Sequence, residues 1–179
     1  MAAPVVVRAA VDADLPAIAA LYGHHVVHGA ASFEVVPPTL DEIRRRYQDV
    51  ISHGLPYVVA SLPNRGARLA GYAYATAYRP RVAYRHTVED SVYVDEECAR
   101  RGAGRALLGA VIHACEALGY RQMIAVIGGS DNAASIRLHS ALGFRHAGVL
   151  SAVGRKFDRW IDTVLMQRAL GPGDSAPAP

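Results

Sequence analysis

The chain has 179 residues and a formal net charge of +3, with 51% hydrophobic and 20% charged residues. This length allows one domain with a full core, and the small charge, without a long basic run, argues against nucleic-acid binding. Apolar runs are too short to span a membrane, Cys98 and Cys115 make no disulfide framework, and the first residues lack a secretion-signal pattern, so a cytoplasmic protein is expected.

Strand and helix patterns alternate along the N-terminal half. Residues 5–8 predict a strand and residues 15–27 a helix with one apolar face. Thr39 and Glu42 form a capping-box pattern that opens a second helix, expected to run through residue 52. Residues 57–62 and 69–77 favour two strands of a hairpin, joined by a Pro-Asn-Arg-Gly turn.

The C-terminal half continues with strands at residues 87–94 and 122–127, each followed by a helical pattern. The second helix is expected at residues 133–142, where Gly143 suits a left-handed helix end. Strands at residues 145–151 and 160–167 close the sheet, and residues 171–179, rich in Pro, Gly and Ala, are expected to be disordered. This order indicates an α/β sandwich around a mixed sheet.

The most informative segment is the loop from Arg100 to Arg105, between the strand at 87–94 and the helix that follows. Free N–H groups of a first helical turn, the helix dipole, two glycines and three arginines suit an anion such as a phosphate. A nucleoside-triphosphate loop requires Gly-Lys-Ser/Thr, whereas Gly104 is followed by Arg105 and Ala106. A dinucleotide fingerprint requires a third glycine, where Leu107 stands. A coenzyme A pyrophosphate site and an ordinary helix start with solvated arginines stay open.

Two segments resemble the GNAT superfamily of N-acetyltransferases. One is the loop itself, which is similar to the signature Gln/Arg-x-x-Gly-x-Gly/Ala, although Ala99 stands at the first position. The other runs from Asn132 to Phe144 and resembles Asn-x-x-Ser/Ala-x-x-Leu-Tyr-x-x-x-Gly-Phe, with His139 at the tyrosine position. The resemblance implies a single GNAT domain over residues 1–170, with about seven strands in a mixed sheet, about four flanking helices, and central strands that splay apart.

Residues 84–94, 154–162 and Ser32-Phe33-Glu34 resemble the phosphinothricin and methionine sulfoximine N-acetyltransferases. This resemblance implies an enzyme that uses acetyl-CoA, without a metal, to acetylate the α-amino group of a small amino-acid analogue such as phosphinothricin, methionine sulfoximine or methionine sulfone. It also implies a homodimer, with an aromatic-basic patch of Lys156, Phe157 and Trp160 near the C-terminal strands. Detoxification is one role that fits such an activity.

The resemblance assigns residues to two binding sites. Those expected to hold acetyl-CoA are Val92, Tyr93, Val94, Arg100, Arg101, Gly102, Ala103, Gly104, Arg105, Asn132 and Ser135. Those expected to line the acceptor pocket are Phe33, Arg79, Arg81, Tyr84 and Thr87. Arginine forks bind oxyanions in bidentate fashion, and Arg85 is also available for the acidic group of the acceptor.

Acetyl transfer to an amine requires a base, an oxyanion donor and a proton for the leaving thiolate. Glu89 is the candidate base, since Val88 and Val92 suggest partial burial and a raised pKa; a structural ion pair with Arg85 or His86 is the alternative. The N–H group of Val94 is the candidate oxyanion donor. Because His139 stands at the family's tyrosine position, the resemblance implies that it is the proton donor; a helix-face histidine beside the cofactor is the alternative.

Two other functions stay open at this point. The same chemistry could serve another amine: an amino acid, a polyamine, which the pair Arg79 and Arg81 disfavours by repulsion, or a protein N-terminus. A degenerate domain could also bind coenzyme A without catalysis, for which Ala99 is the only supporting departure.

Overall fold

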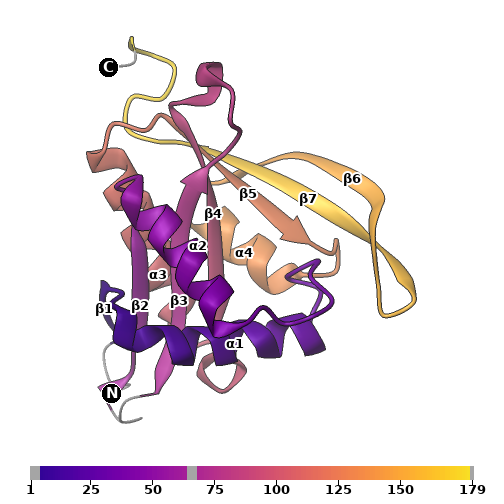
Figure 1. Ribbon diagram of the computed structural model, residues 1–179. Coiled ribbons are helices and arrows are strands. Elements are labelled where there is room, and N and C mark those ends of the chain that lie inside the picture. Colours follow the sequence, from indigo (N-terminus) through magenta and orange to yellow (C-terminus); the bar gives the residue numbers. More distant parts are fainter. Residues whose placement is uncertain (1–4, 64–67, 178–179) are drawn as a thin grey trace.

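The computed structural model describes residues 5–63 and 68–177. A seven-stranded sheet runs through the molecule in the order β1-β2-β3-β4-β5-β7-β6 (Figure 1). Its strands are β1 (Val6–Ala9), β2 (Tyr57–Ser61), β3 (Leu69–Ala77), β4 (Thr87–Val94), β5 (Gln122–Gly128), β6 (Arg145–Lys156) and β7 (Arg159–Ala169). Only β4 and β5 pair in parallel; the other neighbours are antiparallel, so the predicted mixed sheet is confirmed.

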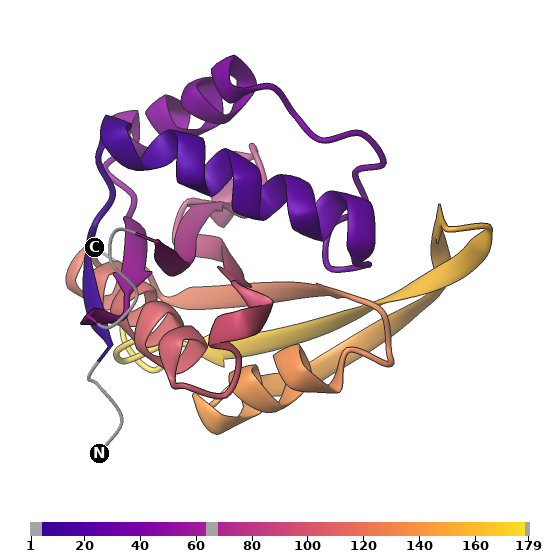
Figure 2. The same ribbon diagram turned by 90° about the horizontal axis from the view of Figure 1, so that it is seen from below.

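Helices cover both faces of the sheet. Figure 2 shows α1 (Leu15–His28) and α2 (Leu40–Ser52) on one side, and α3 (Ala103–Ala117) and α4 (Ala133–Ala141) on the other. Their inward residues, such as Ile18, Leu107 and Val111, are fully buried and form one core with the strands. Burial of this apolar surface is the main term that holds the helices on the sheet.

The ends of the helices follow the expected sequence signals, with one difference. Thr39 Oγ1 accepts a hydrogen bond from the N–H of Glu42 at 3.2 Å, which caps α2. The Glu42 carboxylate does not complete the capping box; it bonds Arg45 and Arg46 instead, because two charged donors bind a carboxylate more strongly than one backbone N–H. Gly143 ends α4 with φ of 85°, as predicted.

β6 and β7 form a hairpin that is longer than the sequence predicted and extends beyond the body of the molecule (Figures 1 and 2). Phe157 and Asp158 make its turn, with φ of 52° and 56°. Side chains exposed over about half of their surface or more make this hairpin apolar: Val149, Leu150, Val153, Phe157 and Trp160. The turn predicted between β2 and β3 lies largely outside the described residues, although the two strands pair as expected. No helix of the described part is long and apolar enough to cross a bilayer.

Candidate active site

The basic loop leads directly into the first turn of α3, as predicted. The first hydrogen bond within α3 runs from the N–H of Ala106 to Gly102 O, at 3.0 Å. The N–H groups of residues 103–105 therefore have no acceptor within the helix. Arg100, Arg101 and Arg105 are exposed around them. Unpaired N–H groups, the helix dipole and three cations make this end of α3 suitable for a pyrophosphate.

The two glycines of this loop are required for different physical reasons. Gly102 has φ of 86°, in the left-handed region, and no atom lies within 4 Å of where its Cβ would be. A Cβ on Gly104 would lie 3.2 Å from Leu138 Cδ2 and 3.4 Å from Val94 Cγ2. Gly102 therefore permits the turn, whereas Gly104 permits α3 to approach β4 and α4 closely.

A gap opens between β4 and β5 at the centre of the sheet. Their paired residues end at Asp90 and Ala125, and the strands separate beyond them. About 390 Å³ of space lies there, lined by residues 90–93 of β4, residues 125–128 of β5, and Ala31, Asn132, Ser135 and His139. The predicted splaying of the central strands is confirmed.

Backbone donors of β4 point into this gap. Thr87 O accepts from Tyr78 N at 3.2 Å, and Asp95 N donates to Ala70 O at 2.9 Å. Because backbone groups alternate in direction along a strand, the odd-numbered residues of β4 form their hydrogen bonds with β3. The N–H groups of Val92 and Val94 therefore face the opposite edge, where β5 has diverged. Sequence reasoning named Val94 as the oxyanion donor; Val92 is equivalent in direction.

His25, in the last turn of α1, fixes this part of β4. Its Nε2 lies 3.0 Å from Val94 O, which can only accept, so Nε2 carries the hydrogen. Burial lowers the pKa of His25, which keeps the ring neutral. A contact across 69 positions of sequence leaves no local signal.

Asn132 and Ser135 line the gap at the start of α4. Asn132 Oδ1 accepts from the N–H of Ser135 at 3.2 Å, and Asn132 Nδ2 donates to Gly128 O at 3.4 Å. The asparagine therefore caps the helix and holds it to the end of β5. Tyr93 differs from the expectation: its backbone lines the gap, but its side chain packs against Tyr22 and Tyr72 on the other side of the sheet.

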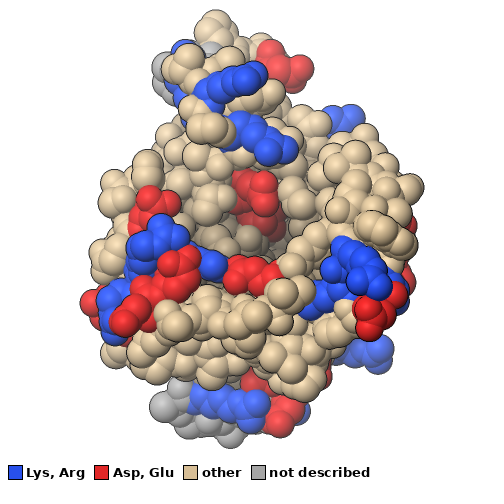
Figure 3. All heavy atoms as spheres, turned by 45° about the vertical axis from the view of Figure 1, so that its right-hand side comes forward, with Lys and Arg blue, Asp and Glu red and all other residues tan. Residues whose placement is uncertain are grey.

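Glu89 lies on β4 opposite Thr76 of β3, and its side chain is half-buried on the α1–α2 face. It forms no ion pair within the described residues, so the alternative of a salt bridge with Arg85 or His86 is wrong. Burial raises the pKa of Glu89, the charge of Asp90 raises it further, and Arg79 lowers it by less. Figure 3 shows acidic atoms at the bottom of a hollow with basic atoms around its rim. An unpaired carboxylate with a raised pKa is suited to accept a proton.

His139 projects from α4 on the opposite face of the sheet and is 2% exposed. Its Nε2 lies 3.0 Å from Asp90 Oδ2, and its Nδ1 lies 2.8 Å from Ser135 O. Burial lowers the pKa of His139, but the hydrogen bond and charge of Asp90, together with the hydrogen bond to Ser135 O, outweigh burial, so the pKa is raised. His139 lines the gap, whereas Glu89 lies one residue before its lining on β4, with its side chain on the other face of the sheet.

The loop at residues 78–86, before β4, holds most of the residues predicted to line the acceptor pocket. Arg79 lies over the ring of Tyr78, with 5.0 Å between the guanidinium carbon and the ring centroid, and Tyr84 packs on the same ring. Arg79, Arg81 and Tyr84 are exposed, while Thr87 is partly buried two residues before Glu89. The structure places these groups near Glu89 in the chain, with both arginines exposed to solvent.

Phe33 lies on the far side of the gap, in the loop between α1 and α2. A Cβ on Gly154 would meet its ring, and a Cβ on Gly128 would lie 3.0 Å from Phe33 Cε1. Two glycines from β5 and β6 therefore make room for one aromatic side chain. Phe33 is still 41% exposed, so its outer face is available to a ligand.

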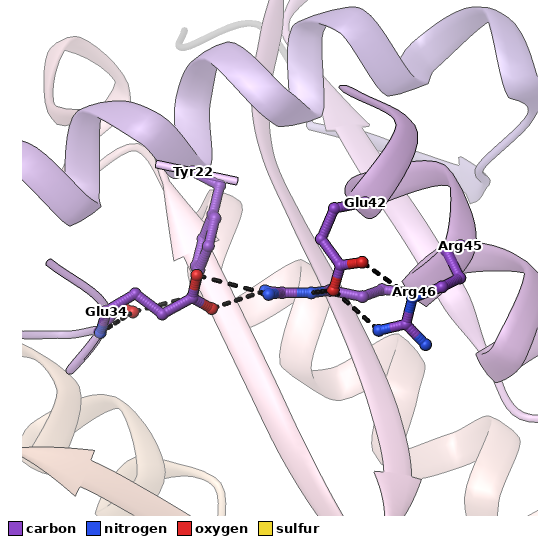
Figure 4. Close-up of polar contacts among 6 residues, drawn as sticks. Tyr22, Glu34, Glu42, Arg45 and Arg46 are labelled. Carbon is purple, nitrogen blue, oxygen red and sulfur yellow. Dashed lines mark hydrogen bonds and ion pairs between the residues drawn. The ribbon is translucent and has the colours of Figure 1, made fainter. Parts of the chain in front are cut away.

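A polar network that sequence reasoning missed anchors this loop (Figure 4). Glu34 Oε1 accepts from Tyr22 Oη at 2.8 Å and from Arg46 Nη1 at 2.6 Å. Arg46 Nε donates to Glu42 at 2.7 Å, and Arg45 bonds the same carboxylate. These residues come from α1, the loop and α2, so only the tertiary fold brings them together.

Beside this network lies a cleft under α2, lined by aromatic side chains. Tyr57, Tyr72 and Tyr74 stack across β2 and β3, with 4.9 Å between the rings of Tyr57 and Tyr74. Thr76, which pairs with Glu89, also lines the cleft. The period-two spacing of tyrosines in the β3 sequence is the signal that could have indicated this aromatic face.

Lys156 contacts Phe157 of the predicted patch, with 5.1 Å between Nζ and the ring centroid, but unlike Phe157 and Trp160 it is not exposed. Its side chain is buried, and Nζ donates to Gly29 O and Ser32 O, each at 2.8 Å. Two unpaired carbonyls of the loop attract the ammonium away from solvent. Lys156 therefore ties the β6–β7 hairpin to the loop that carries Phe33.

Comparisons with known proteins agree with this geometry. The family described as acetyltransferase (GNAT) domain matches residues 7–165. A phosphinothricin N-acetyltransferase of Alcaligenes faecalis is 56% identical over 94% of this chain and 84% of its own length. An L-methionine sulfoximine/L-methionine sulfone acetyltransferase of Pseudomonas aeruginosa is 40% identical over 96% of this chain and 98% of its own. The crystal structure of a phosphinothricin acetyltransferase from Sinorhizobium meliloti, in complex with acetyl-CoA, superimposes with a TM-score of 0.93, 44% identity, and coverage of 98% of this chain and 93% of that one.

Proposed function

This chain belongs to the acetyltransferase (GNAT) family, and on that premise we propose that it transfers the acetyl group of acetyl-CoA to the α-amino group of a small amino-acid analogue. The acceptors are of the phosphinothricin, methionine sulfoximine and methionine sulfone type. One observation carries this proposal: Glu89 is a half-buried carboxylate, without an ion pair in the described residues, beside the gap between β4 and β5.

The residues around the gap fit acetyl-CoA, which supplies the thioester. The N–H groups of residues 103–105 and the arginines of the loop would bind its pyrophosphate. The backbone of residues 92–94 would bind its pantetheine arm along the free edge of β4, with Asn132 and Ser135 on the opposite wall. This arrangement directs the acyl end toward Asp90, where the strands join.

The reacting groups would then be divided between the faces of the sheet. Glu89 accepts a proton from the acceptor's ammonium, because only the neutral amine is a nucleophile. The N–H groups of Val92 and Val94 stabilise negative charge on the acyl oxygen. His139 is the source of the proton that the departing sulfur takes up.

Recognition of the acceptor would use the loop at residues 78–86, before β4. Arg79, Arg81 and Arg85 are exposed there and could bind the carboxylate and the second acidic or polar group of an amino-acid analogue. Phe33, Tyr84 and Thr87 would contact the carbon skeleton between these groups. Such acceptors are consistent with a role in detoxification inside the cell.

A homodimer is part of this proposal. The β6–β7 hairpin presents exposed apolar residues beyond the body of the molecule, among them Trp160 at 67% exposure. An apolar surface of this kind is typical of a protein interface. Sedimentation equilibrium should give a dimer mass; a monomer mass that does not vary with concentration would contradict the dimer.

The activity is tested by thiol release from acetyl-CoA with a panel of acceptors. Methionine sulfoximine, methionine sulfone and phosphinothricin should release coenzyme A and gain one acetyl group by mass spectrometry. Release with peptides alone would instead identify a protein acceptor. Calorimetric binding of acetyl-CoA without release by any acceptor would identify a non-catalytic coenzyme A binder.

A further inference from the structure

We propose that Asp90 and His139 act as one buried acid that supplies the proton to the departing sulfur, with Asp90 as the positioning residue. This inference rests on the acetyltransferase function proposed above. The sequence assigned a role to His139 but none to Asp90.

The two side chains meet at the point where the strands separate. Asp90 is the last residue of β4 that pairs with β5, and His139 lies in the last turn of α4. Both side chains are 2% exposed and both line the gap. The second oxygen of the carboxylate, Asp90 Oδ1, is buried and has no hydrogen-bond partner in the described residues, so His139 is its only neutralising group there.

Hydrogen-bond chemistry fixes the protons of this pair. Ser135 O can only accept, so Nδ1 of His139 carries a hydrogen. A hydrogen bond between Nε2 and Asp90 Oδ2 requires one further proton between them. The pair therefore holds two protons on or next to the ring, and it becomes an anion when it gives one away. Because both ring nitrogens are engaged, the proton available at the gap is the one shared with Asp90.

The groups packed around this pair add no charge that could replace either partner. Cys115 faces Asp90 from α3, and burial, together with the charges of Asp90 and Glu116, raises its pKa to about 12, so the thiol stays neutral. Glu89 is adjacent on β4 but projects to the other face, and Phe144 packs edge-on against the imidazole at 4.9 Å. The carboxylate of Asp90 is thus the group that keeps His139 protonated in a buried setting.

The proton balance of the reaction is then complete. The amide C–N bond forms, the C–S bond breaks, and the sulfur keeps the electron pair of the broken bond. The sulfur takes the proton shared by Asp90 and His139. The acceptor's ammonium loses two protons: one leaves to solvent through Glu89, and the other restores the pair through water, so each turnover releases one proton.

Two variants test the pair, Asp90→Asn and His139→Gln, together with the double variant. Asparagine has the shape of aspartate and can still accept from Nε2, but it provides no charge. Asp41→Asn, a surface substitution at a side chain that is 92% exposed, is the matched control. Thermal unfolding of each variant separates loss of fold from loss of function.

The first readout is the titration of His139 by nuclear magnetic resonance of imidazole nitrogens, which requires no substrate. We expect the pKa of His139 to fall by about one unit or more in Asp90→Asn. The second readout is the pH profile of kcat. Its alkaline limb, which requires the protonated pair, should move to lower pH, and its acid limb should move the same way because Asp90 also raises the pKa of Glu89.

We expect each single variant to lose about 10-fold or more of kcat above neutral pH, and the double variant to lose no more than the worse single one. An unchanged titration of His139 in Asp90→Asn, a lower rate without a shifted profile, or additive losses would overturn the pair. Absence of thiol release from the wild-type protein would overturn the proposed function and this role together, and the titration would still report whether the pair exists.

Discussion

Replacement of Glu89 by glutamine removes the proposed base and leaves the shape of the side chain unchanged. Because Glu89 forms no ion pair in the described residues, glutamine leaves no charged partner without its counterion, and we expect the free energy of unfolding to change by less than about 1 kcal/mol. A positioned base contributes about 10²- to 10⁴-fold, so kcat/KM should fall by that factor near neutral pH, equivalent to about 3 to 5 kcal/mol. The loss should shrink as pH rises, because solvent then deprotonates the amine.

The assay is thiol release with methionine sulfoximine over a range of pH, beside calorimetric titration with acetyl-CoA. Glu89→Asp is the matched variant: it keeps a carboxylate at a longer distance and should retain part of the rate. Binding of acetyl-CoA should stay close to wild type in both, because the loop from Arg100 to Arg105 lies beyond the other end of β4. A Glu89→Gln protein with more than half of the wild-type rate at neutral pH, or with normal turnover but lost acetyl-CoA binding, would refute the assigned role.

Three further predictions follow from the same geometry. Burial and Asp90 raise the pKa of Glu89, so the acid limb of kcat/KM should lie above the usual pKa of a glutamate, and activity should be lost as pH falls through it; a limb at the usual value, measured by initial rates, would contradict this. Gly102→Ala forces a side chain into φ of 86° and should cost about 1 to 2 kcal/mol of stability or of acetyl-CoA affinity, measured by unfolding and calorimetry; an unchanged protein would show that the turn is not required. Gly71→Ala places a Cβ 2.6 Å from Tyr93 O and 3.2 Å from Val94 Cα and should destabilise the protein by about 1 to 3 kcal/mol in urea unfolding; wild-type stability would exclude this packing.

Much of the fold could be predicted because the signals are local. The strand at residues 87–94 and the helix end at Gly143 follow from periodicity and glycine chemistry, and the structure confirms both. The long β6–β7 hairpin could not be predicted, because its turn uses Phe157 and Asp158 in the left-handed region, where sequence reasoning expects glycine or asparagine.

The candidate site divides in the same way. The loop from Arg100 to Arg105 and the position of Glu89 were identified from sequence because each is a short motif on one element. The contacts of Asp90 with His139, of His25 with Val94, and of Lys156 with the loop at Gly29 join residues 49, 69 and 127 positions apart. Such contacts depend on the packing of separate elements, for which one sequence carries no local pattern.

The central claim is that acetyl-CoA binds along the free edge of β4 with its thioester beside Glu89. A crystal structure of this protein with acetyl-CoA tests it most directly. We expect the pyrophosphate on the N–H groups at the start of α3 and the sulfur between Glu89 on one face of the sheet and Asp90 on the other. A cofactor bound elsewhere, or a thioester remote from both carboxylates, would contradict the account.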